Sequence, residues 1–162
     1  AGVGKNIAND TDVNVAGTVE TILADAGRNG TESALDDYTV AAANLTVTKL
    51  SRVVSDGVSA TNPKAIPGAV VEYCISVTNA AGAATATGVQ VSDDLGSVTM
   101  ADVTFDSTFT PKLDGTVVSG STCTPGATNA TYSGGANGIV SGTLTNIAAG
   151  ETRTLVFRVT ID

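Results

Sequence analysis

Short runs in which apolar and polar residues alternate, separated by glycine- and proline-rich segments, constrain the fold of this chain more than any other feature. Alternation with a period of two is the pattern of a β-strand that is buried on one face. The two clearest runs, 69–79 and 152–161, gather these residues on one face: Val71, Tyr73, Ile75, Val77, Leu155, Phe157, Val159 and Ile161. No long stretch shows the helical period, so the sequence predicts an all-β protein.

About seven such runs follow one another from Leu45 onward. They lie at 45–54, 69–79, 88–93, 98–105, 112–120, 138–147 and 152–161. We expect a hairpin turn at Asp114-Gly115, because this pair favours positive φ angles. We also expect a bulge or strand end near Leu50, where the alternation slips, and a loop-rich segment over 121–138. The number and spacing of the runs predict an immunoglobulin-like β-sandwich over 38–162.

Composition and charge narrow the classes of partner. Hydrophobic residues make up 42% of the chain, mostly Ala and Val, with no Trp and one Met. That composition favours a thin sandwich over a bulky helical core. The net charge of −8 argues against binding nucleic acid or an anionic membrane surface. Because no apolar run approaches the ~20 residues of a spanning helix, we expect no membrane span either.

The two cysteines, Cys74 and Cys123, are too far apart in sequence to form a CxxC motif. An even pair in an acidic, β-rich chain indicates a disulfide, and hence a secreted or cell-surface protein. Closing the loop between them would stabilise the fold by about 4 kcal/mol in the chain-entropy model. The alternative is a pair of buried thiols that are not bonded to each other.

An N-terminal extension over 1–37 is surplus to the predicted sandwich. Its segment 12–23 reads DVNVAGTVETIL and alternates like a half-buried strand. The core-facing series of this candidate donor strand is Val13, Val15, Gly17, Val19, Thr21 and Leu23. A polar linker, 24–37, separates it from the sandwich. The open question is whether this strand completes its own sheet or a neighbour's.

Catalytic and metal chemistry receive little support. The chain has no histidine, which excludes Ser-His-Asp and Cys-His nucleophile systems and the common zinc sites. We therefore expect no enzyme, no catalytic residue and no cofactor. Adjacent carboxylates in the chain are expected to cap turns rather than to converge as an acid/base pair.

Calcium binding by loop carboxylates is a weaker hypothesis than simple solvation of these groups, since no EF-hand spacing is present. Its candidate ligands are Asp10, Asp12, Asp25, Asp36 and Asp37, with Glu32, Asp93 and Asp94 as further acidic residues.

The stretch NPKAIPGAVVEYCISVTNAAGAATATGVQVSDDL (62–95) resembles the conserved repeat domain of bacterial surface proteins that is called domain of unknown function 11. The matching motifs are the Pro67-Gly68 turn, Tyr73, the Thr78-Asn79 strand end and the strand 89–93. The closing strand AAGETRTLVFRVTID is also similar, and the resemblance covers about 37–162. It implies an immunoglobulin-like fold, usually found in tandem repeats in large surface or secreted proteins, without catalytic residues.

A single copy with an extra N-terminal strand leads to three hypotheses. In the first, the candidate donor strand enters the next identical subunit, head to tail, and builds an extracellular filament. In the second, the chain is an immunoglobulin-like stalk or adhesin module of a larger bacterial surface protein, and the strand pairs within it. The third, a carbohydrate- or protein-binding module, ranks last because no aromatic cluster forms a sugar platform.

Energetics leave the first two hypotheses open. Burying Val13, Val15, Val19 and Leu23 contributes roughly 1.5–3 kcal/mol each. Association of two subunits costs about 4–15 kcal/mol, so one strand with a helping interface can hold a neighbour. Folding back within one chain gives the same strand an effective concentration of order mM. We favour donation to an identical subunit.

Overall fold

The computed structural model describes residues 41–96, 103–135 and 138–162. The chain divides into two units, Ala1–Val40 and Ala41–Asp162, and every described residue belongs to the second. Within these residues the secondary structure is β-strand without α-helix. The strands are β1 (Leu45–Ser55), β2 (Val70–Asn79), β3 (Gln90–Asp94), β4 (Val103–Phe105), β5 (Lys112–Ser119), β6 (Thr122–Thr124), β7 (Thr128–Asn129), β8 (Thr131–Ser133), β9 (Ile139–Thr143) and β10 (Thr152–Ile161).

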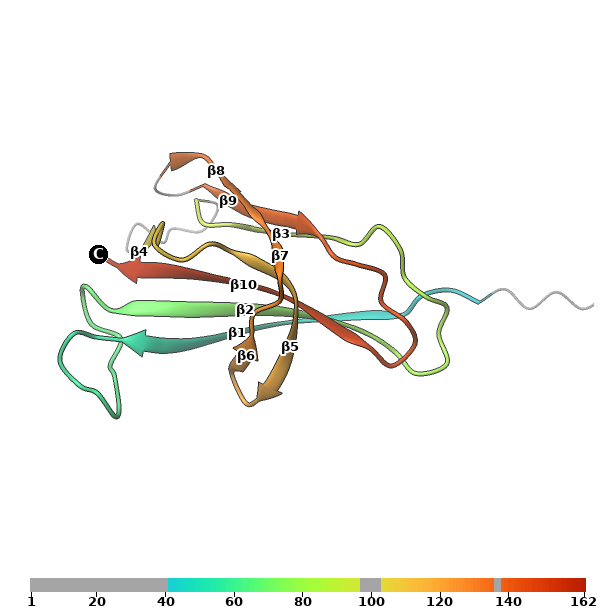
Figure 1. Ribbon diagram of the computed structural model, residues 1–162, viewed down its shortest axis with the longest axis horizontal. Helices are drawn as coiled ribbons and strands as arrows, with labels where there is room; N and C mark the ends of the chain where they lie inside the picture. Colours follow the sequence, from blue (N-terminus) through green and yellow to red (C-terminus); the bar gives the residue numbers. More distant parts are fainter. Residues whose placement is uncertain (1–40, 97–102, 136–137) are drawn as a thin grey trace, which may run out of the picture. The chain divides into compact units, whose positions relative to one another are not determined.

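These strands form two antiparallel sheets, which confirms the predicted all-β class and the two-layer sandwich. The large sheet has the order β1-β2-β10-β5-β6, with β4 paired to β10 and β7 paired to β5. The small sheet has the order β3-β9-β8. Figure 1 shows the small sheet as a separate layer above the large one. The immunoglobulin-like type of this sandwich and its N-terminal extension strand stay predictions, and residues 1–37 lie outside the described part of the chain.

The main core lies between the two layers and follows the alternation read from the sequence. Val71, Ile75 and Val77 of β2 pack there with residues of the small sheet such as Val91 and Val140. The register-matched rings of Tyr73 and Phe157 stack with their centroids 5.4 Å apart. Strand β10 contributes Leu155, Phe157 and Val159, each with 0% of its surface exposed. The predicted core faces of both central strands are therefore confirmed.

A second, smaller core covers the opposite face of the large sheet. Cys74 of β2 and Cys123 of β6 form the predicted disulfide, with their Cα atoms 6.3 Å apart. Val156 of β10 packs with them, and Leu50 and Phe109 close the cluster. The disulfide thus fixes the β5–β6 hairpin against the centre of the large sheet. Both faces of β2 and β10 are consequently buried in their middle sections.

A row of charges crosses the same outer face beside this cluster. Glu72 is only 2% exposed, and it lies in register with Arg52 of β1 and Arg158 of β10. Its carboxylate accepts hydrogen bonds from Arg52 Nε at 2.8 Å and from Arg158 Nη2 at 2.9 Å. The guanidinium of Arg158 also lies over the Phe109 ring, 4.2 Å from its centroid. The buried charge is compensated by two partners, which a buried carboxylate requires.

One local prediction was wrong. Asp114-Gly115 does not form a hairpin turn; Asp114 has a φ of 60° inside β5. It is the extra residue of a bulge, because Thr154 and Leu155 pair with Gly115 and Leu113. The loop-rich segment 121–138 contains three short strands, β6, β7 and β8. The pairing of Ser119 with Thr122 places the hairpin turn between these two residues.

The predicted slip in β1 occurs later than the alternation suggested. The register of β1 on β2 shifts between Val53 and Ser55, and not at Leu50, which pairs regularly with Cys74. Beyond this shift the chain forms a loop that is organised by Asp56. Its Oδ1 accepts the backbone N–H groups of Val58 at 2.9 Å and Ser59 at 2.7 Å.

We predict that the double variant Cys74→Ser/Cys123→Ser unfolds more easily than the native protein. Removing the bond releases a loop of 49 residues in the unfolded state. The chain-entropy model then gives a loss of about 4 kcal/mol in the free energy of unfolding. Urea denaturation of both proteins measures the difference. A loss below about 1 kcal/mol would show that the disulfide does not constrain the unfolded chain in the expected way.

We also predict a pH-dependent contribution from Asp56. Backbone N–H groups of Ser59, Lys64 and Val58 lower the pKa of this carboxyl below its ordinary value of 3.8. A group whose pKa is lower in the folded state stabilises the fold above the unfolded-state pKa, and that stability is lost as pH falls through the folded-state pKa. The stability difference between native protein and Asp56→Asn should therefore be constant near neutral pH and shrink below about pH 4. Denaturation at several pH values tests this, and a difference that stays constant in acid contradicts it.

Candidate functional site

The candidate site is the open side of the sandwich, where each sheet ends in an edge strand. Among the described residues, β1 pairs only with β2 and β3 pairs only with β9. The hydrogen bond from Ala80 N to Asn44 O, 2.9 Å long, sets the alternation of the β1–β2 ladder. By this alternation the N–H and C=O groups of Val47 and Lys49 point away from β2. Among the described residues, the edge of the large sheet thus presents backbone groups at Val47 and Lys49.

The same reasoning applies to the edge of the small sheet. Leu144 N donates to Val89 O at 2.9 Å, which fixes Val89 as a hydrogen-bonded position facing β9. The N–H and C=O groups of the next residue, Gln90, and of Ser92 therefore point away from β9. The edge of β3 can accept a further strand at these two residues.

A groove with a volume of about 470 Å³ runs between the two edges. Its lining is mostly apolar and comes from β1, β2 and the β3 region: Leu45, Val47, Lys49, Ile75, Val77, Val89, Gln90, Val91, Ser92 and Asp93. Most of the lining residues are core-facing residues of the two sheets, and Gln90 and Ser92 belong to the edge of β3. The groove is therefore a continuation of the main core toward solvent.

Exposure along the β1 side of the groove shows that this core is incomplete. Val47 and Val77 are direct partners in the β1–β2 register. Val77 is 2% exposed, whereas Val47 is 63% exposed and Leu45 is 40% exposed. Val77 belongs to the main core, where it packs with Val91 of β3 and Val140 of β9, whereas Val47 lines the open groove. Among the described residues, apolar surface on the core face of β1 is therefore left exposed.

Lys49 bridges the two sheets in the middle of β1. Its ammonium nitrogen lies 2.5 Å from Asp93 Oδ2 of β3 and 4.6 Å from the centroid of the Tyr73 ring. The Asp93 side chain is 14% exposed and that of Lys49 is 45% exposed. The ion pair is thus half-buried and forms one wall at the end of the groove.

A second hollow, of about 370 Å³, lies on the other side of Lys49 along the same face of β1. Its lining is again mostly apolar: Ser51, Arg52, Val53, Ala65, Val71, Tyr73, Val103 and Ile161. The two hollows together follow the core-facing side of β1 from Leu45 to Val53, with Lys49 between them. We call this combined feature the β1 groove.

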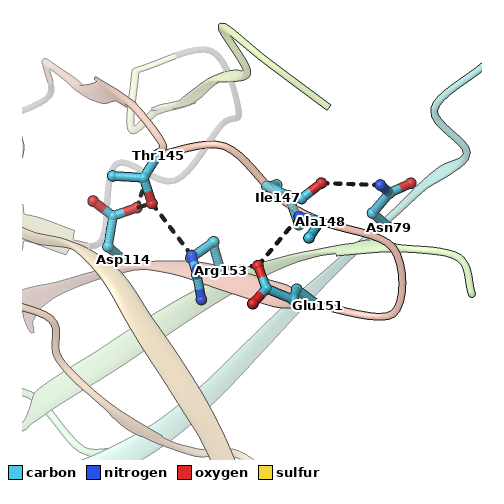
Figure 2. A network of polar contacts seen from close by, with 7 residues as sticks. All are labelled: Asn79, Asp114, Thr145, Ile147, Ala148, Glu151 and Arg153. Atoms are coloured by element: carbon cyan, nitrogen blue, oxygen red, sulfur yellow. Dashed lines mark hydrogen bonds and ion pairs between the residues drawn. The ribbon is translucent and has the colours of Figure 1, made fainter. Parts of the chain in front are cut away.

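A polar network closes the sandwich near the end of β2 (Figure 2). The buried Asn79 side chain donates from Nδ2 to Ile147 O at 3.0 Å and to Ala84 O at 2.8 Å. The Asp114 side chain, at the bulge of β5, points toward Thr145. Its Oδ1 accepts the backbone N–H of Thr145 at 2.9 Å. The Glu151 carboxylate pairs with Arg153 Nη2 at 3.1 Å. These groups satisfy loop backbone and one another, so the network has a structural role.

The structure describes only some of the residues singled out from the sequence. Cys74 and Cys123 form the disulfide. The candidate donor residues Val13, Val15, Val19 and Leu23 and the calcium candidates Asp10, Asp12, Asp25, Asp36 and Asp37 lie outside the described residues. Within 41–96, 103–135 and 138–162, no group of three or more potential ligands that could hold a metal ion occurs.

The side chains of the adjacent residues Asp93 and Asp94 point to opposite faces of β3, as neighbouring residues of a strand do. Asp94 Oδ1 accepts the N–H of Gly96 at 2.9 Å, which is the turn-capping role that we expected. Asp93 instead contacts Lys49 across the groove, a role that sequence reasoning missed. The available signal was the position of Lys49, a charged residue that follows Leu45 and Val47 on the same face.

Comparisons with protein-family models, with curated proteins and with solved structures found no match. The resemblance to the repeat domain of bacterial surface proteins therefore stays a prediction from the sequence. The described part of the chain contains no helix of the length and apolar character needed to cross a membrane.

We predict that truncating Val47 and Val77 to alanine has unequal effects on stability in dilute solution. The two side chains are cross-strand partners, so the loss of strand propensity is matched. Val77→Ala should lower the free energy of unfolding by roughly 2 kcal/mol or more, because Val77 is buried. Val47→Ala should change it by no more than about 0.5 kcal/mol. Equal losses, measured by urea denaturation, would show that the β1 groove is already covered within the single chain.

Proposed function

We propose that this protein is the structural subunit of a homopolymeric extracellular filament. In this proposal the candidate donor strand, 12–23, of one copy inserts into the β1 groove of the next identical copy. The observation that carries the proposal is the uncovered, apolar core face of β1 beside the open edge of β3. A donated strand would extend the small sheet beyond β3 and cover the core face of β1.

The dimensions of donor and groove agree. At about 3.3 Å per residue, the 11 residues of β1 extend roughly 36 Å. The segment 12–23 has about the same extended length. Its alternation would place Val13, Val15 and Val19 on one face, toward the core-facing side of β1, and polar residues such as Asn14 on the other. The segment therefore has both the length and the amphipathic pattern that the groove needs.

The inserted strand would pair with β3, whose Gln90 and Ser92 present backbone groups at the open edge. Its apolar side chains would then lie on the face of β1. Hydrogen bonds along β3 give affinity, and the apolar contacts give specificity, which is the general basis of strand addition. Insertion would also protect an edge that otherwise exposes a template for uncontrolled pairing.

Polymerisation follows from the asymmetry of the contact. The donor segment and the β1 groove are different surfaces of the same chain, so the contact is heterologous and each copy keeps one of each kind available. Such contacts produce open chains unless the rotation between copies closes a ring. The disulfide is compatible with an oxidising, extracellular compartment. The acidic charge of the chain fits a protein exposed to solvent outside the cell.

The alternative function uses the same groove differently. If segment 12–23 enters the groove of its own chain, the protein is a closed immunoglobulin-like module, as expected of a stalk or adhesin domain in a larger surface protein. The short linker would favour this arrangement through a high effective concentration. The two proposals differ in one measurable property, which is whether disrupting the segment abolishes association or destabilises the single chain.

We predict that the variant Val15→Asp/Val19→Asp remains folded but loses the ability to form filaments, because two carboxylates cannot enter an apolar groove without a large desolvation cost. The matched control is Ala16→Asp/Thr18→Asp, which adds the same charges on the opposite face of the segment and should still assemble. Size-exclusion chromatography and electron microscopy report both outcomes. Filaments from the first variant would refute strand donation.

Deleting residues 1–23 separates the two functions. Under the filament proposal, the truncated protein is a folded monomer with a circular dichroism spectrum like that of the native chain. If the deletion unfolds the protein instead, the strand belongs to its own sandwich and the module function is the correct one.

A further inference from the structure

The Lys49–Asp93 ion pair interrupts the β1 groove at its centre. Lys49 is a core-facing residue of β1, four positions after Leu45 and four before Val53 in the sequence. Its ammonium reaches Asp93 at 2.5 Å and lies over Tyr73 at 4.6 Å. An extended chain that follows the groove from one hollow to the other must pass this bridge.

We propose that the Lys49–Asp93 bridge sets the register of the donated strand by accepting Gly17 and rejecting any residue with a side chain at that point. This inference rests on the proposed function and specifies how its partner segment is recognised. In the core-facing series of the donor, Gly17 alone lacks a side chain. Apolar residues lie on both sides of it, as the two apolar hollows lie on both sides of Lys49.

Placing Gly17 at the bridge determines what lies on either side of it. Val15 and Val19 are the nearest core-facing residues of the donor, one on each side of Gly17. With Gly17 at the bridge, the hollows receive the residues around Val15 and Val19. One valine would enter each hollow whichever way the donated strand runs.

The bridge is expected to persist in the assembled state. Asp93 is largely buried at 14% exposure, and separating it from Lys49 would leave a carboxylate without its counter-charge in an apolar groove, which is strongly unfavourable. A β-branched side chain at position 17 would have to displace Lys49 from both Asp93 and the Tyr73 ring. Glycine leaves this space free, and a slip by two residues would place valine there instead.

The first experiment compares filament formation by full-length variants. Gly17→Val should raise the critical concentration for assembly at least about tenfold, the factor that corresponds to 1.4 kcal/mol. The control Ala16→Val adds the same bulk on the opposite face and should leave the critical concentration within about twofold. Removing the bridge in Gly17→Val/Lys49→Ala/Asp93→Ala should restore assembly to within about threefold of the native chain, because the clash is gone. Circular dichroism confirms that each variant is folded.

The outcomes distinguish this inference from the proposed function. If the native protein forms filaments that depend on Val15 and Val19, strand donation stands. Normal assembly of Gly17→Val would then overturn the register alone. A Gly17→Val defect that the bridge-free variant does not relieve would also overturn it, since glycine would be needed for another reason.

A second measurement keeps the inference testable should the bridge-free variant fail to fold. Val15→Cys/Val47→Cys and Val15→Cys/Ser51→Cys both keep Gly17 and the bridge, and each places the two new cysteines opposite each other for one direction of the donated strand. In filaments, one of the two should be linked between copies by a short bifunctional thiol reagent that spans the roughly 10 Å between facing sheets, seen as a ladder on a denaturing gel. The matched pair Ala16→Cys/Val47→Cys, with its donor cysteine on the opposite face, should not be linked. No linking in either of the first two variants, or equal linking in all three, would overturn the register.

Discussion

The structure depends on a difference in width between its two sheets. The large sheet ends at β1 and the small sheet ends at β3, and between these two edges the core face of β1 lines an open groove. Apolar side chains on that face, such as Val47, are consequently exposed while their partners on β2 are buried. A sandwich normally buries the inner faces of both sheets. The open groove, the bridge across it and the proposed strand donation all follow from this single difference.

Polar contacts and the disulfide hold the strands of the folded unit together away from the open groove. Glu72 joins the three strands β1, β2 and β10 through Arg52 and Arg158. Asn79 accepts the N–H of Asn44 just before β1 at 3.1 Å and donates to the loop that precedes β10. The Cys74–Cys123 bond holds the outer layer. These connections hold β1 in the large sheet by contacts on β2, which leaves its core face available for another strand.

Much of the fold could be predicted from the sequence because alternation is a local signal. The faces of β2 and β10, with Val71, Ile75, Leu155 and Phe157 toward the core, were read directly from a period of two. The disulfide followed from an isolated pair of cysteines. Asp114-Gly115 was misread because positive φ is a local requirement that a hairpin turn and a bulge both satisfy. Only the pairing of β5 with β10, a contact between distant segments, distinguishes them.

The candidate site could be predicted only in part for the same reason. The amphipathic segment 12–23 is visible in the sequence, but the groove that we propose receives it is made by β1 and β3, which do not pair with each other. The contact of Lys49 with Asp93 depends on how the two layers stack, and strand periodicity gives no information about layer stacking. Lys49 could be noticed as a charge in an apolar row, yet its partner could not be named.

The most direct test is the structure of the assembled protein, determined by electron cryo-microscopy of its filaments. Our account predicts that residues 12–23 run beside β3 and over the core face of β1 in a neighbouring copy, and that the linker leads from there back to the donor's own sandwich. A structure in which this segment fills the groove of its own chain, or in which the groove stays empty between copies, would contradict it.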